Sequence, residues 1–255
     1  MTQTSSNSLM PGDPIMPATV TQKMFAWSIH LLTATGAIWA LLTILAIEQG
    51  AWHWAFLWIV LAVIIDAVDG GLARLFQASS VLPDFDGALL DNIVDYLNYV
   101  FVPAYLLYTT GLLPESVAFL GALIILLTSG YQFCQSEAKT EDHHFKGFPS
   151  YWNILALYVL LLNLNPWLNF VAVVMFGILV FVPILYVYPT RTTQYLRLTM
   201  TLTILWGIIS AVVLFQYPQP QPWMVWASFL YLIYYAGLSL YNTWQRQYQL
   251  FRKSK

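Results

Sequence analysis

Charged residues are scarce in this chain. It has 10 Lys and Arg and 12 Asp and Glu, so that 9% of its 255 residues are charged, whereas ordinary soluble domains carry about 25%. Hydrophobic residues reach 59%. A water-soluble globular domain is therefore excluded, and the composition predicts an integral membrane protein.

Cysteine and histidine are also rare. The single cysteine, Cys134, lies inside an apolar stretch, which excludes an intrachain disulfide framework and a zinc site made of several thiolates. Of the four histidines, His30 and His53 stand alone, and the pair of His143 and His144 has no third ligand to complete a set. We therefore expect no histidine to bind a metal.

Long apolar stretches, in contrast, are abundant. A transmembrane helix needs about 20 mostly apolar residues, and we predict eight spans on this basis. They cover approximately residues 25–47, 54–76, 87–108, 116–136, 149–164, 167–188, 194–217 and 223–243. The predicted fold class is an all-α polytopic membrane protein with eight transmembrane helices.

The basic residues test this assignment, because Lys and Arg concentrate in cytoplasmic connections. All ten fall on one predicted side, at Lys23, Arg74, Lys139, Lys146, Arg191, Arg197, Arg246, Arg252, Lys253 and Lys255. Both termini are thus predicted to be cytoplasmic. Residues 1–22 lack the apolar core of a cleavable signal peptide. We expect a cytoplasmic tail over 1–22, a membrane domain over 23–245 and a basic cytoplasmic tail over 246–255.

Four aspartates interrupt the apolar pattern at helical spacing. The second predicted span ends in D-x-x-D-G-x-x-A-R from Asp66 to Arg74, and the third begins with G-x-x-x-D-x-x-x-D from Gly87 to Asp95. Spacings of three and four residues place each set on one stripe of its helix. One Asp at the centre of a membrane helix costs about 2.5–3.5 kcal/mol. Four of them therefore indicate a site with cations or water.

Carboxylate oxygens without His or Cys favour a hard cation, so we predict Mg²⁺ or Mn²⁺ bound by Asp66, Asp69, Asp91 and Asp95. Two divalent ions would neutralise the four charges, and paired metals of this kind clamp phosphoryl groups. The small residues Gly70 and Ala73 leave room for a ligand, and the Arg74 guanidinium suits a phosphate. These residues together predict phosphoryl-transfer chemistry.

The complete pattern resembles the signature of the CDP-alcohol phosphotransferases, membrane enzymes of phospholipid synthesis. Every fixed position of that signature is present between Asp66 and Asp95. Twelve residues separate Arg74 from Gly87, where most members have eight. The longer spacer, with V-L-P-D-F-D-G over 81–87 and F-K-G-F-P-S-Y-W-N over 145–153, is similar to the bacterial phosphatidylcholine synthases of the family.

The resemblance implies a reaction and its residues. The substrates would be CDP-diacylglycerol and free choline, and the products phosphatidylcholine and CMP. The four aspartates would hold two divalent metals, with Asp95 and Asp91 as the catalytic pair and Asp95 as the general base. The donor would be bound by Gly70, Ala73, Arg74, Gly87 and Lys139.

A choline site should offer aromatic faces to the quaternary ammonium, since each favourable cation–π contact contributes about 0.5–2 kcal/mol. Candidates near the predicted cytoplasmic end are Tyr96, Tyr99, Tyr131, Glu137, Tyr151, Trp152 and Asn153. Among these we favour the segment 150–153, because Pro149 is suited to the start of a helix there.

Several alternatives stay open at this point. The acceptor could be serine, glycerol phosphate or inositol phosphate, or the enzyme could combine CDP-choline with diacylglycerol. Intramembrane carboxylates also mark ion-coupled transporters, although residues 115–255 contain no second acidic motif. A catalytically silent membrane scaffold is a further alternative. We expect residence in the bacterial inner membrane, a site facing the cytoplasm, contact with membrane lipids, no nucleic-acid partner and, by family analogy, a homodimer.

Overall fold

The computed structural model describes residues 18–140 and 142–253, and within these ranges the chain is dominated by helices. In chain order the elements are α1 (Val20–Glu48), α2 (Trp52–Leu75), α3 (Ala78–Val81), α4 (Gly87–Asp95), the π-helix η1 (Tyr96–Phe101), α5 (Val102–Thr109), α6 (Glu115–Cys134), β1 (His144–Lys146), α7 (Trp152–Leu162), α8 (Pro166–Leu179), β2 (Leu185–Val187), α9 (Leu196–Phe215) and α10 (Pro222–Lys253).

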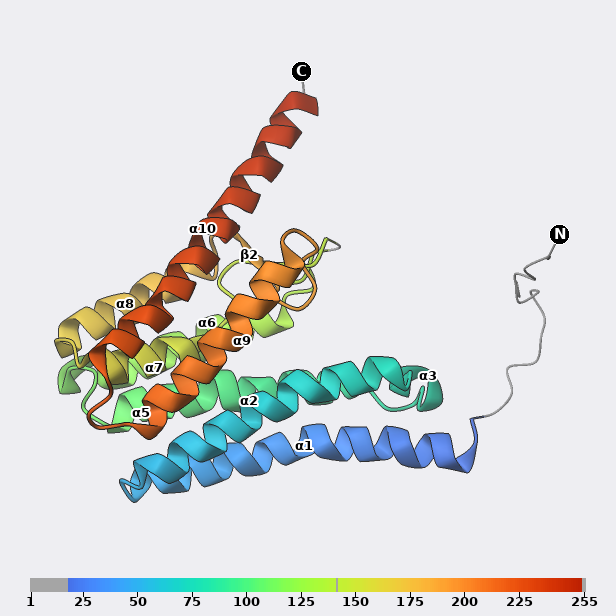
Figure 1. The fold of residues 1–255 in the computed structure, drawn as a ribbon, viewed down its shortest axis with the longest axis horizontal. Coiled ribbons are helices and arrows are strands. Elements are labelled where there is room, and N and C mark those ends of the chain that lie inside the picture. Colours follow the sequence, from blue (N-terminus) through green and yellow to red (C-terminus); the bar gives the residue numbers. More distant parts are fainter. Residues whose placement is uncertain (1–17, 141, 254–255) are drawn as a thin grey trace.

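Helices α1 and α2 form a long antiparallel pair along one side of the molecule (Figure 1). The Thr19 side chain caps α1 by accepting a hydrogen bond from the backbone of Gln22 at 3.2 Å, which satisfies one of the free N–H groups at a helix start. The buried residues of α1 recur every three or four positions and include Gly36 and Ala40. Small residues let membrane helices approach closely. A Cβ atom on Gly36 would lie 2.3 Å from Cγ1 of Val94, so this glycine lets α4 approach α1.

The third helical segment runs through α4, η1 and α5 without a break. The Asp86 carboxylate caps its start by accepting a hydrogen bond from the backbone N–H of Leu89 at 2.9 Å. In the π-turn, the Asn98 amide donates hydrogen bonds to the carbonyl oxygens of Gly36 and Val94, both at 3.0 Å. This widened turn ties the segment to α1 immediately after Asp95, and π-turns are often found at functional sites.

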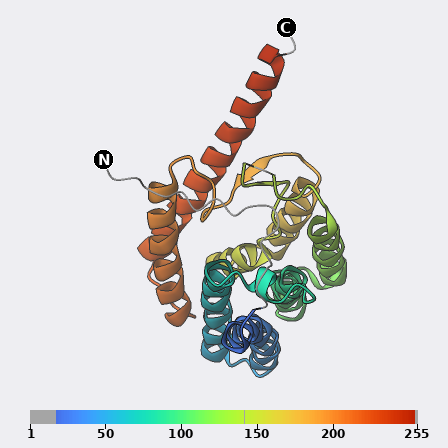
Figure 2. The ribbon, with the colours of Figure 1, turned by 90° about the vertical axis from the view of Figure 1, so that its right-hand side faces the viewer.

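Helices α5 to α8 contribute most of the interior. The side chains of Val100, Leu107, Ile125, Trp152 and Val173 are all fully buried, and they come from five different segments. Figure 2 shows these helices grouped around one core, with α9 and α10 on one side of the group. The core therefore joins elements that are distant in sequence.

A short antiparallel sheet departs from the all-helical expectation. The strands β1 and β2 pair with His144 opposite Val187 and Lys146 opposite Leu185. The prediction of a membrane span over 167–188 was wrong at its C-terminal end, because α8 stops at Leu179 and the chain continues into β2. Pro183 follows the helix end, and proline cannot extend an α-helix without losing a hydrogen bond.

Helix α10 has 32 residues, a length of about 48 Å at the usual rise per residue. The helix packs against α9, its middle turns bond to β2 through Tyr235, Ser239 and Thr243, and its last turns project from the body of the molecule (Figure 1). The helix continues to Lys253, so the predicted start of the C-terminal tail at residue 246 falls inside it. The predicted N-terminal tail lies mostly outside the described residues.

The model confirms an all-α membrane protein in its main features. Within residues 18–140 and 142–253, five helices are long and apolar enough to cross a bilayer, namely α1, α2, α6, α9 and α10. The apolar helices α7 and α8 are shorter than a full span, and the third predicted span is divided by the π-turn. Each of the eight predicted spans nevertheless contains a helix.

Candidate active site

Three of the four predicted carboxylates meet at one point between α2 and α4. One carboxylate oxygen from each of Asp66, Asp91 and Asp95 lies within 4.8 Å of the others. The spacing of four residues between Asp91 and Asp95 puts both on the face of α4 that meets α2. The sequence prediction that the two acidic stripes face each other is thus confirmed for these three residues.

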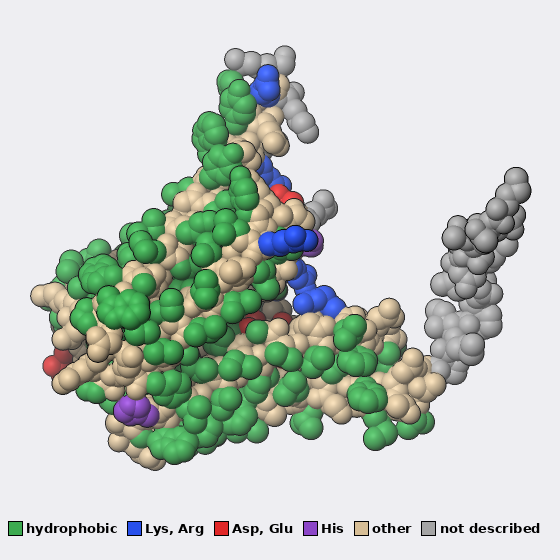
Figure 3. Space-filling model, in the orientation of Figure 1, with side chains coloured by type: hydrophobic (Ala, Val, Ile, Leu, Met, Phe, Trp, Pro, Cys, Tyr) green, Lys and Arg blue, Asp and Glu red, His purple; other side chains and the backbone are tan. Residues whose placement is uncertain are grey.

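The carboxylates line a cavity that is closed on its other sides by α1 and by the π-turn. Its lining comprises Thr33, Gly36, Ala62, Ile65, Asp66, Asp69, Asp91, Val94, Asp95, Asn98 and Tyr99. Figure 3 shows acidic side chains at the floor of a hollow between the α1–α2 pair and the rest of the molecule, with basic side chains along its edge. A charged ligand can therefore reach the carboxylates from outside.

Asp69 completes the acidic lining from a more enclosed position. Its side chain is 3% exposed, and its Oδ1 atom has no hydrogen-bond partner among the described residues. Thr33 and Arg74 interact with the same carboxyl group. A buried carboxylate oxygen without a partner is costly, and a bound cation would satisfy it. Asp66, Asp91 and Asp95 thus form an all-carboxylate group that could hold a metal ion, and Asp69 lines the same cavity.

The π-turn brings a tyrosine onto this cluster. The Tyr99 hydroxyl donates a hydrogen bond of 2.6 Å to Oδ2 of Asp66, which fixes the orientation of that carboxylate. The sequence analysis placed Tyr99 among the acceptor ligands, whereas the structure gives its hydroxyl a carboxylate partner. Regular α-helical geometry for 96–101 would not have revealed this contact, because the π-turn depends on hydrogen bonds to α1.

Two cations lie beside the carboxylates. Lys139, in the loop after α6, interacts electrostatically with Asp66 and Asp95. Arg74 is exposed at the end of α2, and its guanidinium nitrogen lies 3.4 Å from the point where a Cβ on Gly70 would be. The predicted donor ligands Arg74 and Lys139 therefore both interact electrostatically with the carboxylate cluster.

Gly87 has a different neighbour from the one that the sequence suggested. A Cβ atom at this position would lie 2.3 Å from the imidazole ring of His30 on α1. His30 is 6% exposed and packs against Phe85, with ring centroids 4.7 Å apart. Gly87 thus allows α4 to approach α1 closely. The sequence analysis missed this role of His30, because an isolated histidine in an apolar span carries no signal for its partner.

The predicted choline ligands point in different directions. The Tyr96 hydroxyl donates to the carbonyl oxygen of Leu126 at 2.8 Å. Tyr131 is exposed and packs on Phe181. The Trp152 side chain is fully buried and donates a hydrogen bond from its indole N–H to Oγ of Ser129 at 2.6 Å. These three side chains are engaged away from the carboxylates.

The remaining predicted ligands are divided between the surface and the interior. Glu137 is exposed and forms a 3.0 Å ion pair with Lys146, whose hydrogen bond lowers the pKa of the Glu137 carboxyl. Asn153 lines an apolar cavity between α2, α5, α7 and α9 that Asn98 also borders. Tyr151 interacts electrostatically with Asp66 and Asp95. Tyr151 is therefore the member of the 150–153 segment that interacts electrostatically with the carboxylates.

Comparison with known proteins agrees with this site. Residues 28–185 match the family model for CDP-alcohol phosphatidyltransferase. A relative from Legionella pneumophila is 43% identical over 241 residues, covering 91% of this chain and 94% of the relative. One from Pseudomonas aeruginosa is 36% identical over 221 residues, covering 87% and 93%. Both are named phosphatidylcholine synthase. Since the matched segment carries all four aspartates, the chain belongs to the CDP-alcohol phosphatidyltransferase family.

Proposed function

We propose that this protein is a phosphatidylcholine synthase, which transfers the phosphatidyl group of CDP-diacylglycerol to choline and releases CMP. The observation that carries the proposal is the convergence of Asp66, Asp91 and Asp95 within 4.8 Å at the edge of an apolar helix bundle. The shared name of the similar relatives supports choline as the acceptor. Serine, glycerol phosphate and inositol phosphate are the competing acceptors.

The site suits two divalent cations, Mn²⁺ or Mg²⁺, held by Asp66, Asp69, Asp91 and Asp95. The all-carboxylate donor set and the unpartnered Oδ1 of Asp69 support this assignment. When bound, such ions would neutralise the donor diphosphate and make its phosphorus more electrophilic. The choice between the two metals does not affect the roles proposed for the side chains below.

The donor binds at the cavity mouth in this proposal. Gly70 and Ala73 have little bulk, so the nucleotide can lie against α2, and the exposed Arg74 guanidinium can pair with its phosphate. Lys139, in the loop after α6, also interacts with the carboxylates. The two basic side chains would therefore hold the diphosphate between them. Gly87, which packs on His30, contributes by fixing the start of α4.

Asp95 acts as the general base, and Asp91 orients the reacting groups beside it. Asp95 removes the hydroxyl proton of choline as the choline oxygen forms a bond to the phosphorus that carries diacylglycerol. The bond between this phosphorus and the bridging oxygen breaks, and that oxygen leaves with CMP. General-base assistance contributes about 10²–10⁴-fold to such steps. No covalent intermediate with the protein is needed.

The membrane arrangement follows from the same proposal. We place all eight helical segments in the inner membrane of a bacterium, with both termini and the carboxylate site at the cytoplasmic side, because the ten basic residues lie in alternate connections. A homodimer is proposed by family analogy alone. Water-soluble choline and CMP would then exchange directly with the cytoplasm, while both lipids stay in the bilayer.

The test is release of CMP from CDP-diacylglycerol by the purified protein in detergent, with choline, serine, glycerol phosphate or inositol phosphate in parallel reactions containing Mn²⁺ or EDTA. Metal-dependent release with choline alone is the expected result. Release with a different acceptor would overturn the choline assignment and keep the family chemistry. No release with any of the four would contradict an active enzyme and favour the transporter or scaffold alternatives.

A further inference from the structure

A wall of tyrosines stands beside the carboxylates, and most of it lies outside the segment that matches the family model. We define the tyrosine wall as Tyr151, which precedes α7, Tyr186 of β2, and Tyr231 and Tyr235 of α10. The family match ends at residue 185. Three of the four tyrosines therefore belong to the part of the chain that the family signature does not cover.

The wall is centred on Tyr235. The ring centroid of Tyr235 lies 6.4 Å from that of Tyr151, 6.3 Å from Tyr186 and 6.2 Å from Tyr231. Tyr151 is in turn close enough to interact electrostatically with Asp66 and Asp95. The rings thus connect Tyr151, which interacts with the carboxylates, to α10.

The geometry of choline decides which aromatic rings can contact it. Only two carbon atoms separate its ammonium nitrogen from its hydroxyl oxygen, and that hydroxyl must reach Asp95 in the proposed reaction. The ammonium group must therefore bind immediately next to the carboxylate cluster. Of the four wall tyrosines, Tyr151 is the one that interacts electrostatically with Asp66 and Asp95, and it also interacts with Tyr99, which lines the carboxylate cavity. Tyr151 is therefore the candidate for this contact. Tyr96, Tyr131 and Trp152 are engaged with α6, Phe181 and the buried core.

Tyr188 is also excluded, although it lies near the wall. The Arg191 guanidinium lies over its ring, 5.3 Å from the centroid, and Phe145 stacks on the ring at 4.7 Å. Its ring is thus already in contact with a cation of the protein itself. The contact has the geometry of a cation–π interaction.

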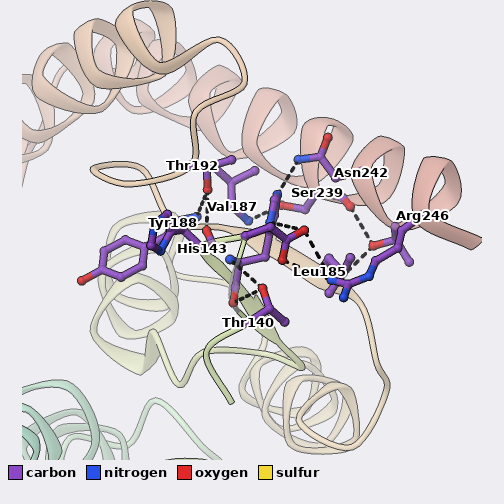
Figure 4. Close-up of polar contacts among 12 residues, drawn as sticks. Thr140, His143, Leu185, Val187, Tyr188, Thr192, Ser239, Asn242 and Arg246 are labelled. Atoms are coloured by element: carbon purple, nitrogen blue, oxygen red, sulfur yellow. Dashed lines mark hydrogen bonds and ion pairs between the residues drawn. The ribbon is translucent and has the colours of Figure 1, made fainter. Parts of the chain in front are cut away.

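Helix α10 holds the wall in place through a row of polar side chains. The backbone N–H groups of Leu185 and Val187 donate to the hydroxyls of Thr243 and Ser239 at 2.8 and 3.2 Å, and the Tyr235 hydroxyl donates to the carbonyl of Val187 at 2.9 Å. Figure 4 shows Ser239 on α10 beside Val187 of β2. The exposed edge of the sheet is therefore bonded to one face of the helix.

The same face of α10 also fixes the loop that leads to β1. Asn242 pairs with the imidazole of His144 at 3.1 Å, and Arg246 forms a 3.2 Å ion pair with Asp142 (Figure 4). Because both ends of the β1–β2 sheet are held in this way, the tyrosine wall is preorganised. Preorganisation reduces the cost of ordering side chains around a small ligand.

We propose that Tyr151 and Tyr235 bind the trimethylammonium group of the acceptor, so that α10 determines acceptor specificity. The inference rests on the proposed function, since it takes choline as the acceptor. The aromatic faces would stabilise the cation on one side, and the carboxylates would attract it from the other. The structure thereby places metal and donor binding on α2 and α4, and acceptor recognition at the opposite wall.

The test uses tetramethylammonium as a probe, because it carries the same methylated cation and lacks the reacting hydroxyl. We expect Tyr151→Leu and Tyr235→Leu each to raise the KM for choline and the inhibition constant of tetramethylammonium together, by about 3- to 30-fold. The KM for CDP-diacylglycerol should change by less than about twofold. Tyr151→Phe and Tyr235→Phe keep the rings and should recover most of the loss.

Tyr234→Leu is the matched control. Tyr234 is adjacent to Tyr235 on α10, but its hydroxyl pairs with Thr199 of α9 at 2.8 Å, so its removal should leave the inhibition constant of tetramethylammonium unchanged. Thermal unfolding in detergent verifies that each variant is folded. An unchanged tetramethylammonium constant in both Leu variants would overturn the inference. A wild-type protein that does not use choline would instead overturn the proposed function.

Discussion

The two sides of the candidate site are constructed in different ways. The carboxylate side takes its ligands from α2 and α4, two helices joined by a short connection, and all four aspartates lie within thirty residues. The tyrosine wall takes its rings from α10, from β2 and from the residue before α7, and these are separated by up to 84 residues. A local motif can therefore preserve the chemistry, while distant elements adapt the acceptor site.

The largest expected effect lies on the carboxylate side. Asp95→Asn removes a charge and a proton acceptor with little change in volume, so turnover should fall by at least about 10²–10⁴-fold while the protein stays folded. CMP release measures the loss, and size-exclusion chromatography in detergent verifies the fold. Near-normal turnover would show that Asp95 is not the general base. It would also contradict the assignment of the chemical step to the carboxylate side of the site.

Substitution of Trp152 tests whether this residue binds choline, as its place in the segment 150–153 suggested, or only fills the core. Because its side chain is fully buried, Trp152→Ala should create a cavity and destabilise the protein by about 3–5 kcal/mol. The measurement is thermal unfolding, with Trp226→Ala as control, since Trp226 is 61% exposed. A stable Trp152→Ala protein with a raised KM for choline alone would instead restore Trp152 to the acceptor site.

Thr243 tests the attachment of β2 to α10. Thr243→Val keeps the shape of the side chain but leaves the N–H of Leu185 without its acceptor, which should cost about 1–3 kcal/mol of stability. The control is Thr128→Val, since the Thr128 hydroxyl donates only within its own helix, to Ile124. If both variants melt at the same temperature, the bonds between α10 and the sheet do not stabilise the wall.

An effect smaller than that of Asp95→Asn is expected at Tyr99. Tyr99→Phe removes the hydrogen bond to Asp66, worth about 1.5–3 kcal/mol for a charged acceptor, so kcat should fall by about tenfold or more. The KM for choline should stay within about twofold, because Tyr99 acts through Asp66. A change in that KM with constant kcat would assign Tyr99 to acceptor binding, as the sequence analysis first suggested.

The sequence predicted the carboxylate cluster because its determinants are local. Asp91 and Asp95 share a helix face by spacing alone, and the apolar context made the charges conspicuous. The contact of Tyr99 with Asp66 could not be predicted in the same way, because it requires a π-turn held by the bond of Asn98 to Gly36. A tertiary hydrogen bond leaves no periodic signal in the chain.

The sheet and the orientation of the aromatic residues could not be predicted from the sequence, for a similar reason. Three-residue strands such as β1 and β2 are too short for an alternating pattern, and their pairing joins residues about forty positions apart. Tyr151 and Trp152 are neighbours in sequence, yet one side chain interacts electrostatically with the carboxylates and the other fills the core. The sequence can therefore indicate which segment lies near a site, whereas tertiary packing decides which side chain of that segment faces the site.

The contact between Gly87 and His30 has an evolutionary consequence. The glycine belongs to the signature and the imidazole does not, yet there is no room for a Cβ between them. Any relative that carries a side chain at position 87 would need a smaller residue at position 30, or a displaced first helix. The two positions should therefore covary, and an alignment of relatives would reveal whether this glycine is retained for helix packing and not for contact with a ligand.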